Sequence, residues 1–337
     1  MGKLKAVVIG CGAIGTRAHI PFLMKHPKVN VVAACDIDDE ACKNAQKLNV
    51  PKIYQDWEKM LDIEKPDMVS VCTPNYLHKN MVIGAASRGV HVLCEKPMAT
   101  SFADAQEMAK AVQKNDVKCM IGFTHRFMQE NIKLKNIVDS GDIGTPFFSQ
   151  VRFAHAGPEN GWSNTDWWFN KAQSGGGSLV DMAVHAIDLT HWIMGRTRSV
   201  SAQIATLIKK IEVDDNSCLV LRNDRGFSIV NASWSSPVGI NGILVVGTEG
   251  AIERPYGEPM RICRGLTLAD GTNKMEWQTV EVENAISGYE AEFNVWVDYV
   301  LNDNKEAVPM VPEGLAAQAV IEAAYKSSAN AVNIDEL

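Results

Sequence analysis

The sequence predicts an α/β domain followed by an α+β domain with an open sheet, and three observations lead to this fold class. The chain has 337 residues, about twice the usual length of one domain. Its first part alternates short apolar runs with helical patterns, which is typical of βαβ units on a parallel sheet. After Phe123 the apolar runs lengthen and partly alternate with polar residues. We therefore expect one domain over residues 1–123 and a second over residues 124–337.

The predicted parallel sheet rests on short apolar runs rich in Val, Ile and Ala. These runs are Leu4–Ile9, Val29–Cys35, Met68–Cys72, Val90–Cys94 and Lys118–Ile121. Helical stretches lie between them at Ile14–Lys25, Asp39–Leu48, Tyr76–Ser87 and Phe102–Lys114. Strands that are apolar along nearly their whole length fit a sheet covered on both faces, with right-handed crossovers between strands.

The second predicted sheet rests on longer runs with partial alternation, a pattern that indicates strands with one face toward water. These runs are residues 146–155, 198–208, 215–222, 227–234 and 241–247. A helical pattern interrupts them from Ser178 to Met194, and two more, Gly288–Leu301 and Glu313–Ala329, close the chain.

Composition excludes several classes of function. The formal net charge of −7 disfavours a nucleic-acid or anionic-membrane partner, because both need a basic surface. No apolar run approaches the roughly 20 residues of a membrane span, and the N-terminus leads directly into a strand rather than a signal peptide. The eight cysteines form no C-x-x-C pair and indicate reduced core thiols. We therefore expect a cytoplasmic protein.

A glycine-rich turn follows the first predicted strand and opens a helix. Gly10-Cys11-Gly12-Ala13-Ile14-Gly15 matches G-x-G-x-x-G. In this pattern the first glycine permits a tight turn, the second lets backbone approach a pyrophosphate, and the third lets the helix pack on the strand. The N–H groups of the helix N-terminus then attract the phosphates. Because the turn stands in a βαβ context, it predicts a Rossmann domain whose dinucleotide contacts Gly10, Gly12, Ala13, Ile14 and Gly15.

Asp36 ends the second predicted strand, about 20 residues after the turn, where an acidic residue accepts hydrogen bonds from the ribose hydroxyls. We place Ile37 in the same site. Asp38 and Asp39 repel a 2′-phosphate, so the sequence favours NAD over NADP, although Arg17 in the first helix is a basic residue within reach. The alternative is that Asp36 caps the next helix, a task that suits Asp38 better.

Two more polar segments follow predicted strands, where ligands of such sheets bind. The first is Thr73-Pro74-Asn75, which is otherwise an ordinary strand-to-helix turn. The second is Glu95-Lys96-Pro97. Near a cationic nicotinamide, Lys96 would have a lowered pKa or would hydrogen-bond a substrate oxygen. The alternative for Lys96 is a solvated surface lysine.

The predicted helix after Gly175–Gly177 carries acidic and histidine side chains. Asp181 and His185 stand at i and i+4 and share one face, with Asp188 close to it. A carboxylate that orients an imidazole suits proton transfer near neutral pH. Metal binding is disfavoured because the spacing matches no usual ligand motif. A second alternative is a core histidine bonded to Asp188, but the glycines indicate close backbone approach to a ligand or tight domain packing.

Just upstream, Trp167 and Trp168 form an aromatic pair. Aromatic faces stack on the C–H faces of sugars, which makes Trp168 a candidate substrate residue. Paired tryptophans are, however, more often core or interface residues.

Together these residues resemble the Gfo/Idh/MocA family, which includes glucose-fructose oxidoreductase and inositol dehydrogenase. The resemblance covers essentially the whole chain. The segments that carry it are Gly10–Gly15 with Asp36, Cys72–Asn75 with His78, Glu95–Pro97, Gly122–Phe127 with Arg126, Gly175–Gly177 with Asp181, His185 and Asp188, Trp234, and Ile243–Ile252.

The resemblance implies a Rossmann domain plus an α+β domain with a large, mostly antiparallel open sheet, whose open face commonly joins homodimers or homotetramers. It assigns catalysis to Lys96, Asp181 and His185. It adds His78 and Glu95 to the cofactor site and Arg126 to the substrate site. Family members often have Gly where Ala183 stands and Asn or Arg where His125 stands, and His125 bears on the substrate pocket.

The resulting hypothesis is an NAD-dependent dehydrogenase acting on a secondary alcohol of a cyclic polyol or sugar, or on the matching ketone. His185 takes the hydroxyl proton, Lys96 stabilises charge on the same oxygen, and Asp181 orients the substrate or His185. One alternative is a non-catalytic NAD-binding sensor, which need not keep these three residues. Another is a lyase or hydrolase that uses NAD only as a transient oxidant.

Overall fold

The computed structural model of the protein describes residues 2–160, 165–267, 273–283, 286–306 and 308–330. By contact the chain divides into two compact units. The first unit comprises Met1–Thr124, Ala172–Gly175 and Gly288–Gln318, and the second comprises His125–Lys171, Gly176–Ser287 and Ala319–Leu337. These units describe packing, and the division into domains at residues 123 and 124 stays a prediction.

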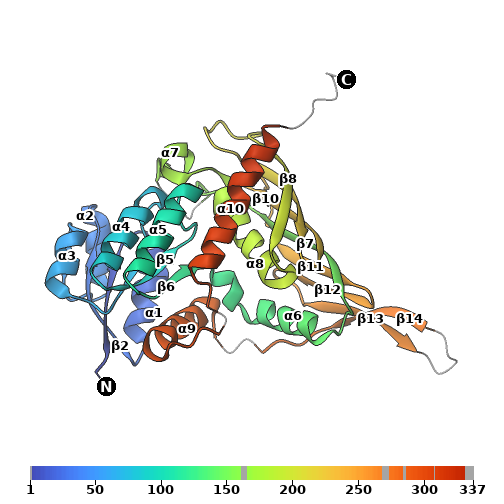
Figure 1. Cartoon of the computed structure of the whole chain (residues 1–337), viewed down its shortest axis with the longest axis horizontal. Coiled ribbons are helices and arrows are strands. Elements are labelled where there is room, and N and C mark those ends of the chain that lie inside the picture. Colours follow the sequence, from blue (N-terminus) through green and yellow to red (C-terminus); the bar gives the residue numbers. More distant parts are fainter. Residues whose placement is uncertain (1, 161–164, 268–272, 284–285, 307, 331–337) are drawn as a thin grey trace. The chain divides into compact units, whose positions relative to one another are not determined.

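The first unit is built on a six-stranded sheet with the order β3-β2-β1-β4-β5-β6. Its strands are β1 (Leu4–Ile9), β2 (Val29–Cys35), β3 (Ile53–Tyr54), β4 (Met68–Val71), β5 (His91–Glu95) and β6 (Cys119–Gly122). All neighbouring strands run parallel. The strand order reverses at β1, which neighbours both β2 and β4, so the carboxyl ends of these strands form a topological switch point. Figure 1 labels β2, β5 and β6 of this sheet. The predicted Rossmann domain is confirmed.

Helices flank the strands of the first unit. They are a π-helical turn η1 (Gly15–His19) continuing into α1 (Ile20–Lys25), α2 (Asp39–Lys47), α3 (Trp57–Glu64), α4 (Asn75–Ser87), α5 (Phe102–Lys114) and α9 (Gly288–Asn302). Helix α9 packs on α1, where Phe22 stacks on Phe293 with ring centroids 5.9 Å apart. The C-terminal part of the chain therefore completes the core of the first unit.

The second unit contains an eight-stranded sheet with the order β14-β13-β12-β11-β7-β10-β9-β8. Its strands are β7 (Pro146–Ala154), β8 (Thr197–Ala205), β9 (Asn216–Asn223), β10 (Gly226–Ser233), β11 (Gly242–Gly247), β12 (Gly250–Pro255), β13 (Arg261–Thr267) and β14 (Asn273–Thr279). Only β7 and β10 pair in parallel. The predicted large, mostly antiparallel sheet is confirmed.

One face of this sheet is covered and the other is open. Along β9 the buried Leu219 and Leu221 alternate with the exposed Cys218 and Val220. A second π-helical turn, η4 (Leu179–Ala183), continues into α8 (Val184–Met194), and both pack against the buried side of β7 and β10. The alternating strands therefore have one solvent-exposed face, as their sequence predicts.

Shorter segments complete the second unit. They are η2 (Thr124–Phe127), α6 (Gln129–Ser140) and η3 (Asp166–Phe169), with α10 (Val311–Ser328) contributing its last turns. The short helix α7 (Lys171–Ser174) belongs almost entirely to the first unit. None of the helices in the described ranges has both the length and the apolar character of a membrane span.

Candidate functional site

The glycine turn after β1 combines two tightly packed glycines with one that faces open space. Gly10 has φ +95°, and a Cβ atom there would stand 2.6 Å from the backbone of Cys72. A Cβ on Gly15 would stand 2.1 Å from the Gly10 carbonyl oxygen. A Cβ on Gly12 would meet no atom within 4 Å. The turn is therefore closed on the protein side and open where a ligand is expected, beside the exposed Ala13 and the half-buried Ile14.

The carboxylate of Asp36 is fixed beside this turn. Its Oδ2 accepts a hydrogen bond of 2.7 Å from the backbone N–H of Cys11, and its Oδ1 accepts one of 3.0 Å from the N–H of Asp38. The cap of α2 is Asp38, whose Oδ1 accepts from the N–H of Ala41 at 2.8 Å. Ile37, between the two acids, is 83% exposed. Asp38, not Asp36, is therefore the N-cap of α2, and Asp36 lines the glycine turn.

The segment Thr73–Asn75 follows β4 and is braced from two sides. His78 is fully buried, and its ring nitrogens lie 2.9 Å from the carbonyl oxygens of Thr73 and Pro97. Burial lowers the pKa of His78. Asn75 donates a 2.7 Å hydrogen bond from Nδ2 to the carbonyl of Ser174. His78 and Asn75 therefore hold the loops that follow β4 and β5. Pro74 precedes the first turn of α4.

Glu95, at the end of β5, holds the backbone of Lys96. Its Oε2 accepts a 3.1 Å hydrogen bond from the N–H of Lys96, and its Oε1 lies 2.9 Å from Nε2 of His19. Burial alone would raise the pKa of Glu95, but the His19 hydrogen bond and the charges of His19 and Lys96 outweigh it and hold that pKa below its ordinary value. Gly122 leaves the necessary room, since a Cβ there would stand 3.2 Å from the Glu95 carboxyl.

A second buried carboxyl, Glu292 on α9, completes this cluster. Burial and the nearby charge of Glu95 raise the pKa of Glu292 well above its ordinary value. Thr124 donates a 2.8 Å hydrogen bond from Oγ1 to Glu292. The two carboxyls therefore differ in direction, since the pKa of Glu95 is lowered and that of Glu292 is raised. Neither His19 nor Glu292 is among the predicted site residues. The position of His19, four residues after Gly15 in the first helix, is the signal that could have found it.

The glycines before η4 pack against protein rather than a ligand. A Cβ on Gly177 would stand 1.8 Å from the carbonyl oxygen of Asp214, and one on Gly176 would stand 2.0 Å from Oη of Tyr325. The Asp214 carboxylate accepts hydrogen bonds from the N–H groups of Gly177 at 3.0 Å and Leu179 at 2.9 Å. Tyr325 donates to the same carboxylate at 2.5 Å. The sequence left open whether these glycines allow a ligand or other protein atoms to come close. For Gly176 and Gly177 the structure shows close packing against protein atoms.

Asp181 and His185 lie on the η4–α8 segment in the second unit. Asp181 is 4% exposed and its Oδ2 accepts a 3.2 Å hydrogen bond from Nε1 of Trp234. His185 is half-buried, and its ring centroid lies 4.4 Å from that of His125. A buried carboxylate therefore stands one helical turn before a half-buried imidazole on the same segment.

Asp188 and Arg126 form a buried ion pair. The Arg126 guanidinium donates from Nε at 2.8 Å and from a terminal nitrogen at 2.7 Å to the two oxygens of Asp188. The two residues are 8% and 1% exposed. This bidentate pairing holds η2 against α8. The place of Arg126 in the substrate site stays a prediction.

Trp167 and Trp168 stack on each other in η3, with ring centroids 3.9 Å apart. Both are half-buried. Phe169 beside them meets Trp234 edge-on at 6.2 Å, so η3 lies near the Asp181 partner within the same unit. Within the described residues, no group of three or more His, Cys, Asp or Glu side chains is arranged to hold a metal ion.

Two family models match the chain. Residues 4–123 match the oxidoreductase family with an NAD-binding Rossmann fold. Residues 131–253 match the Gfo/Idh/MocA C-terminal domain. The two matches follow each other in the order of the two sheets.

Named relatives extend the match over the chain. This chain is 30% identical to myo-inositol 2-dehydrogenase of Thermotoga maritima over 73% of both chains. It is 25% identical to D-apiose dehydrogenase of Rhizobium rhizogenes over 99% of this chain and 98% of the relative. Among solved structures, levoglucosan dehydrogenase in complex with NADH and levoglucosan superposes with a TM-score of 0.85 at 21% identity, over 97% of each chain. The fold is thus shared along the full length.

Proposed function

Because the chain belongs to the Gfo/Idh/MocA family of NAD-binding oxidoreductases, we propose that it oxidises a secondary alcohol of a cyclic polyol or sugar, or reduces the matching ketone. The observation that carries this proposal is the set of residues at the carboxyl ends of the strands in the first unit's sheet. The glycine turn, Asp36, Thr73 and Lys96 all follow the carboxyl ends of parallel strands that neighbour one another. In such sheets this edge binds the dinucleotide.

The residues present fit NAD. Gly12 leaves space for a pyrophosphate beside the N–H groups that open the helix. The Asp36 carboxylate retains lone pairs for ribose hydroxyls while two backbone N–H groups hold it in place. Its negative charge disfavours a 2′-phosphate, which argues for NAD over NADP. When bound, NAD supplies the hydride acceptor.

The protein side of the reaction is proton transfer. We assign the removal of the hydroxyl proton to the half-buried His185, and the orientation of His185 or substrate to the buried Asp181. Lys96 hydrogen-bonds the same oxygen and stabilises the negative charge that develops there. In the reverse direction His185 or Lys96 returns the proton. We also place Trp168 and Arg126 in the substrate site, with Trp168 offering an aromatic face to the sugar ring.

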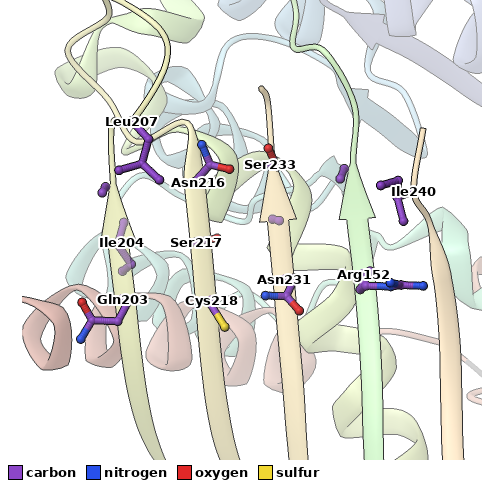
Figure 2. A pocket seen from close by; sticks show the side chains of 13 residues that line it. Arg152, Gln203, Ile204, Leu207, Asn216, Ser217, Cys218, Asn231, Ser233 and Ile240 are labelled. Carbon is purple, nitrogen blue, oxygen red and sulfur yellow. The ribbon is translucent and has the colours of Figure 1, made fainter. Parts of the chain in front are cut away.

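We also propose that the protein forms homodimers or homotetramers through the open face of the second sheet. Strand pairing puts Val220, Phe227, Met275 and Trp277 on this face, where each is at least 44% exposed. Large apolar side chains on one uncovered face favour association with a second copy. Polar side chains, including Arg152 and Asn231, line a hollow at one end of the face (Figure 2). Sedimentation velocity tests the assembly, and Phe227→Glu should shift it toward monomer.

Free thiols favour a reducing compartment. All eight cysteines are unbridged, and burial raises the pKa values of Cys72 and Cys94 well above the ordinary value, which makes these thiols unreactive. This is the pattern of a cytoplasmic protein.

The function is tested by following the near-ultraviolet absorbance of reduced nicotinamide. Purified protein is mixed with NAD, and separately with NADP, across a panel of inositols, hexoses and sugar acids. We expect NADH formation with at least one cyclic polyol or sugar. Lys96→Met should abolish this turnover while NAD still binds, because the substitution removes the donor and leaves the glycine turn untouched. Normal turnover in Lys96→Met contradicts the catalytic assignment, and NAD binding without turnover across the panel favours the sensor.

A further inference from the structure

A buried histidine at the end of η1 is bonded to the residue that precedes Lys96. His19 closes the π-helical turn that begins at Gly15, the third glycine of the glycine turn. Its Nε2 lies 2.9 Å from Oε1 of Glu95, and both residues belong to the first unit. The other carboxyl oxygen of Glu95, Oε2, accepts the backbone N–H of Lys96 at 3.1 Å. One carboxylate therefore joins the helix of the glycine turn to the backbone of the proposed catalytic lysine.

The hydrogen bond between His19 and Glu95 has one direction. Although burial opposes it, the hydrogen bond and charge of His19 help to hold the pKa of Glu95 below its ordinary value. At pH 7 the Glu95 carboxylate therefore accepts hydrogen bonds and donates none. Nε2 of His19 must then carry the proton. Because Glu95 is only 7% exposed, water competes little with this charged hydrogen bond.

The surroundings of His19 would suit an apolar side chain better than an imidazole. His19 is fully buried, and the ring of Phe293 meets it edge-on with centroids 4.9 Å apart. Its Nδ1 is buried and has no hydrogen-bond partner in the part of the chain that the structure describes. A buried nitrogen without a partner costs free energy, which a residue present only for packing would avoid. The hydrogen bond to Glu95 is the interaction that requires an imidazole here.

A second carboxyl near Glu95 increases its dependence on His19. Glu292 accepts a 2.8 Å hydrogen bond from Thr124 rather than bonding Glu95, and burial together with the charge of Glu95 raises the pKa of Glu292. Without His19, the Glu95 carboxylate would be buried beside another carboxyl and would lose a charged hydrogen bond. It would then take up a proton or turn away. In both cases the N–H of Lys96 loses the acceptor that holds it.

We propose that His19 is a positioning residue for Lys96 and acts through Glu95. It fixes the carboxylate that holds the N–H of Lys96, and it does so from the helical turn that the glycine segment opens. His19 thus connects the segment proposed to bind the pyrophosphate with the lysine proposed to bond the substrate oxygen. The inference rests on the proposed function for the role of Lys96, whereas the connection from His19 through Glu95 to the backbone does not depend on any substrate.

The connection is tested first without substrate, by hydrogen exchange of the Lys96 amide. In full-length protein labelled with ¹⁵N-lysine, this amide is identified by the loss of its signal in Lys96→Arg. We expect it to exchange about tenfold faster in His19→Leu, the equivalent of one hydrogen bond. His19→Gln places an amide N–H close to the position of Nε2 and should restore slow exchange. His19→Asn carries the same amide one methylene short of Glu95 and should not.

Phe22→Leu is the matched control for packing, because Phe22 stacks on Phe293 between α1 and α9 and has no hydrogen bond to lose. This variant should leave the exchange of the Lys96 amide unchanged. If His19→Leu also leaves it unchanged, or if His19→Gln and His19→Asn behave alike, the proposal is overturned, whatever the enzyme turns over.

The consequence for the reaction is tested with the substrate found on the panel. We expect kcat to fall about tenfold in His19→Leu, because a small misplacement of a catalytic group is costly. The affinity for NAD measured by calorimetry should not change, and His19→Gln should recover most of kcat. Glu95→Gln should also lower kcat, and the double variant should be no slower than the slower single variant, since both changes break one connection.

A merely structural His19 gives a different result. Its loss would lower kcat no more than Phe22→Leu does, or its effect would add to that of Glu95→Gln, and each of these outcomes overturns the proposal. If the wild type oxidises no member of the panel, the proposed function fails instead, and the exchange of the Lys96 amide still decides whether His19 holds this backbone.

Discussion

Two glycine-rich segments of this chain look alike in sequence and differ in what they contact. Gly10–Gly15 and Gly175–Gly177 each precede a π-helical turn that continues into an α-helix. In each, a carboxylate accepts a hydrogen bond from a backbone N–H: Asp36 from Cys11 at 2.7 Å, and Asp214 from Gly177 at 3.0 Å. Both segments therefore combine a helix start with a carboxylate that accepts a hydrogen bond from the backbone of the glycine segment.

The difference lies on the side where a Cβ atom would project. At Gly12 that side is empty within 4 Å, whereas at Gly177 it is filled by the backbone of Asp214 at 1.8 Å. A glycine in a turn therefore indicates that another group approaches the backbone closely, but the sequence does not show whether that group is protein or ligand. The space beside Gly12 is therefore open to a ligand, whereas the space beside Gly177 is occupied by the protein's own backbone.

The largest expected effect is on the stability of Gly177→Ala. The new methyl group would overlap the Asp214 carbonyl oxygen, which accepts the N–H of Ser178 at 2.9 Å, so backbone on both sides must move. We expect a loss of about 4 kcal/mol or failure to fold. Urea denaturation followed by circular dichroism measures it. A loss below about 0.5 kcal/mol, the range of neutral surface changes, would mean that the triplet is not closely packed.

The next effect is on cofactor affinity in Asp36→Asn. Removing the charge weakens the hydrogen bonds to the ribose hydroxyls, and bonds to charged groups contribute about 1.5–3 kcal/mol. We therefore expect NAD to bind roughly 10- to 100-fold more weakly by calorimetry. Asp38→Asn is the matched control, because asparagine also caps helices well and Asp38 caps α2. Equal losses in the two variants would assign the effect to general electrostatics.

The sequence was sufficient where most residues of an element are buried. β1 and β2 coincide with the predicted runs Leu4–Ile9 and Val29–Cys35, because parallel strands covered on both faces are apolar along most of their length. It failed at β13 (Arg261–Thr267) and β14 (Asn273–Thr279), which no prediction included. β14 ends the sheet and its residues 274–279 are all exposed, so burial imposes no alternation there. Short elements such as β3 also left too little pattern to detect.

At the candidate site the sequence located motifs but not their partners. The turn, Asp36 and the Glu95-Lys96-Pro97 segment were found because local spacing defines them. The partner of Asp188 was not, since Arg126 lies 62 positions away and only the folded chain brings them together. The same holds for Asp214 and Gly177, which are 37 positions apart. Long-range pairing, rather than local chemistry, therefore limited what the sequence could predict.

A smaller effect is expected for Gly12→Ala, which tests the open side of the comparison. A methyl group in the space for the pyrophosphate should weaken NAD binding about tenfold, or roughly 1.4 kcal/mol. Stability should stay within about 0.5 kcal/mol, because the methyl group meets no protein atom. Calorimetric titration and thermal melting without cofactor measure the two quantities. A large drop in melting temperature with unchanged affinity would place Gly12 in the same category as Gly177.

The smallest effect is expected for Tyr325→Phe, which removes one donor from the closed side. Asp214 keeps the N–H groups of Gly177 and Leu179 and the hydroxyl of Ser178, each within 3.0 Å. The loss should therefore be about 1 kcal/mol of stability, the net contribution of a typical hydrogen bond. Urea denaturation measures that loss, and calorimetric titration should give unchanged NAD affinity. If the variant instead lost NAD affinity while keeping its stability, the second glycine segment would also serve a ligand, and the contrast between the two segments would disappear.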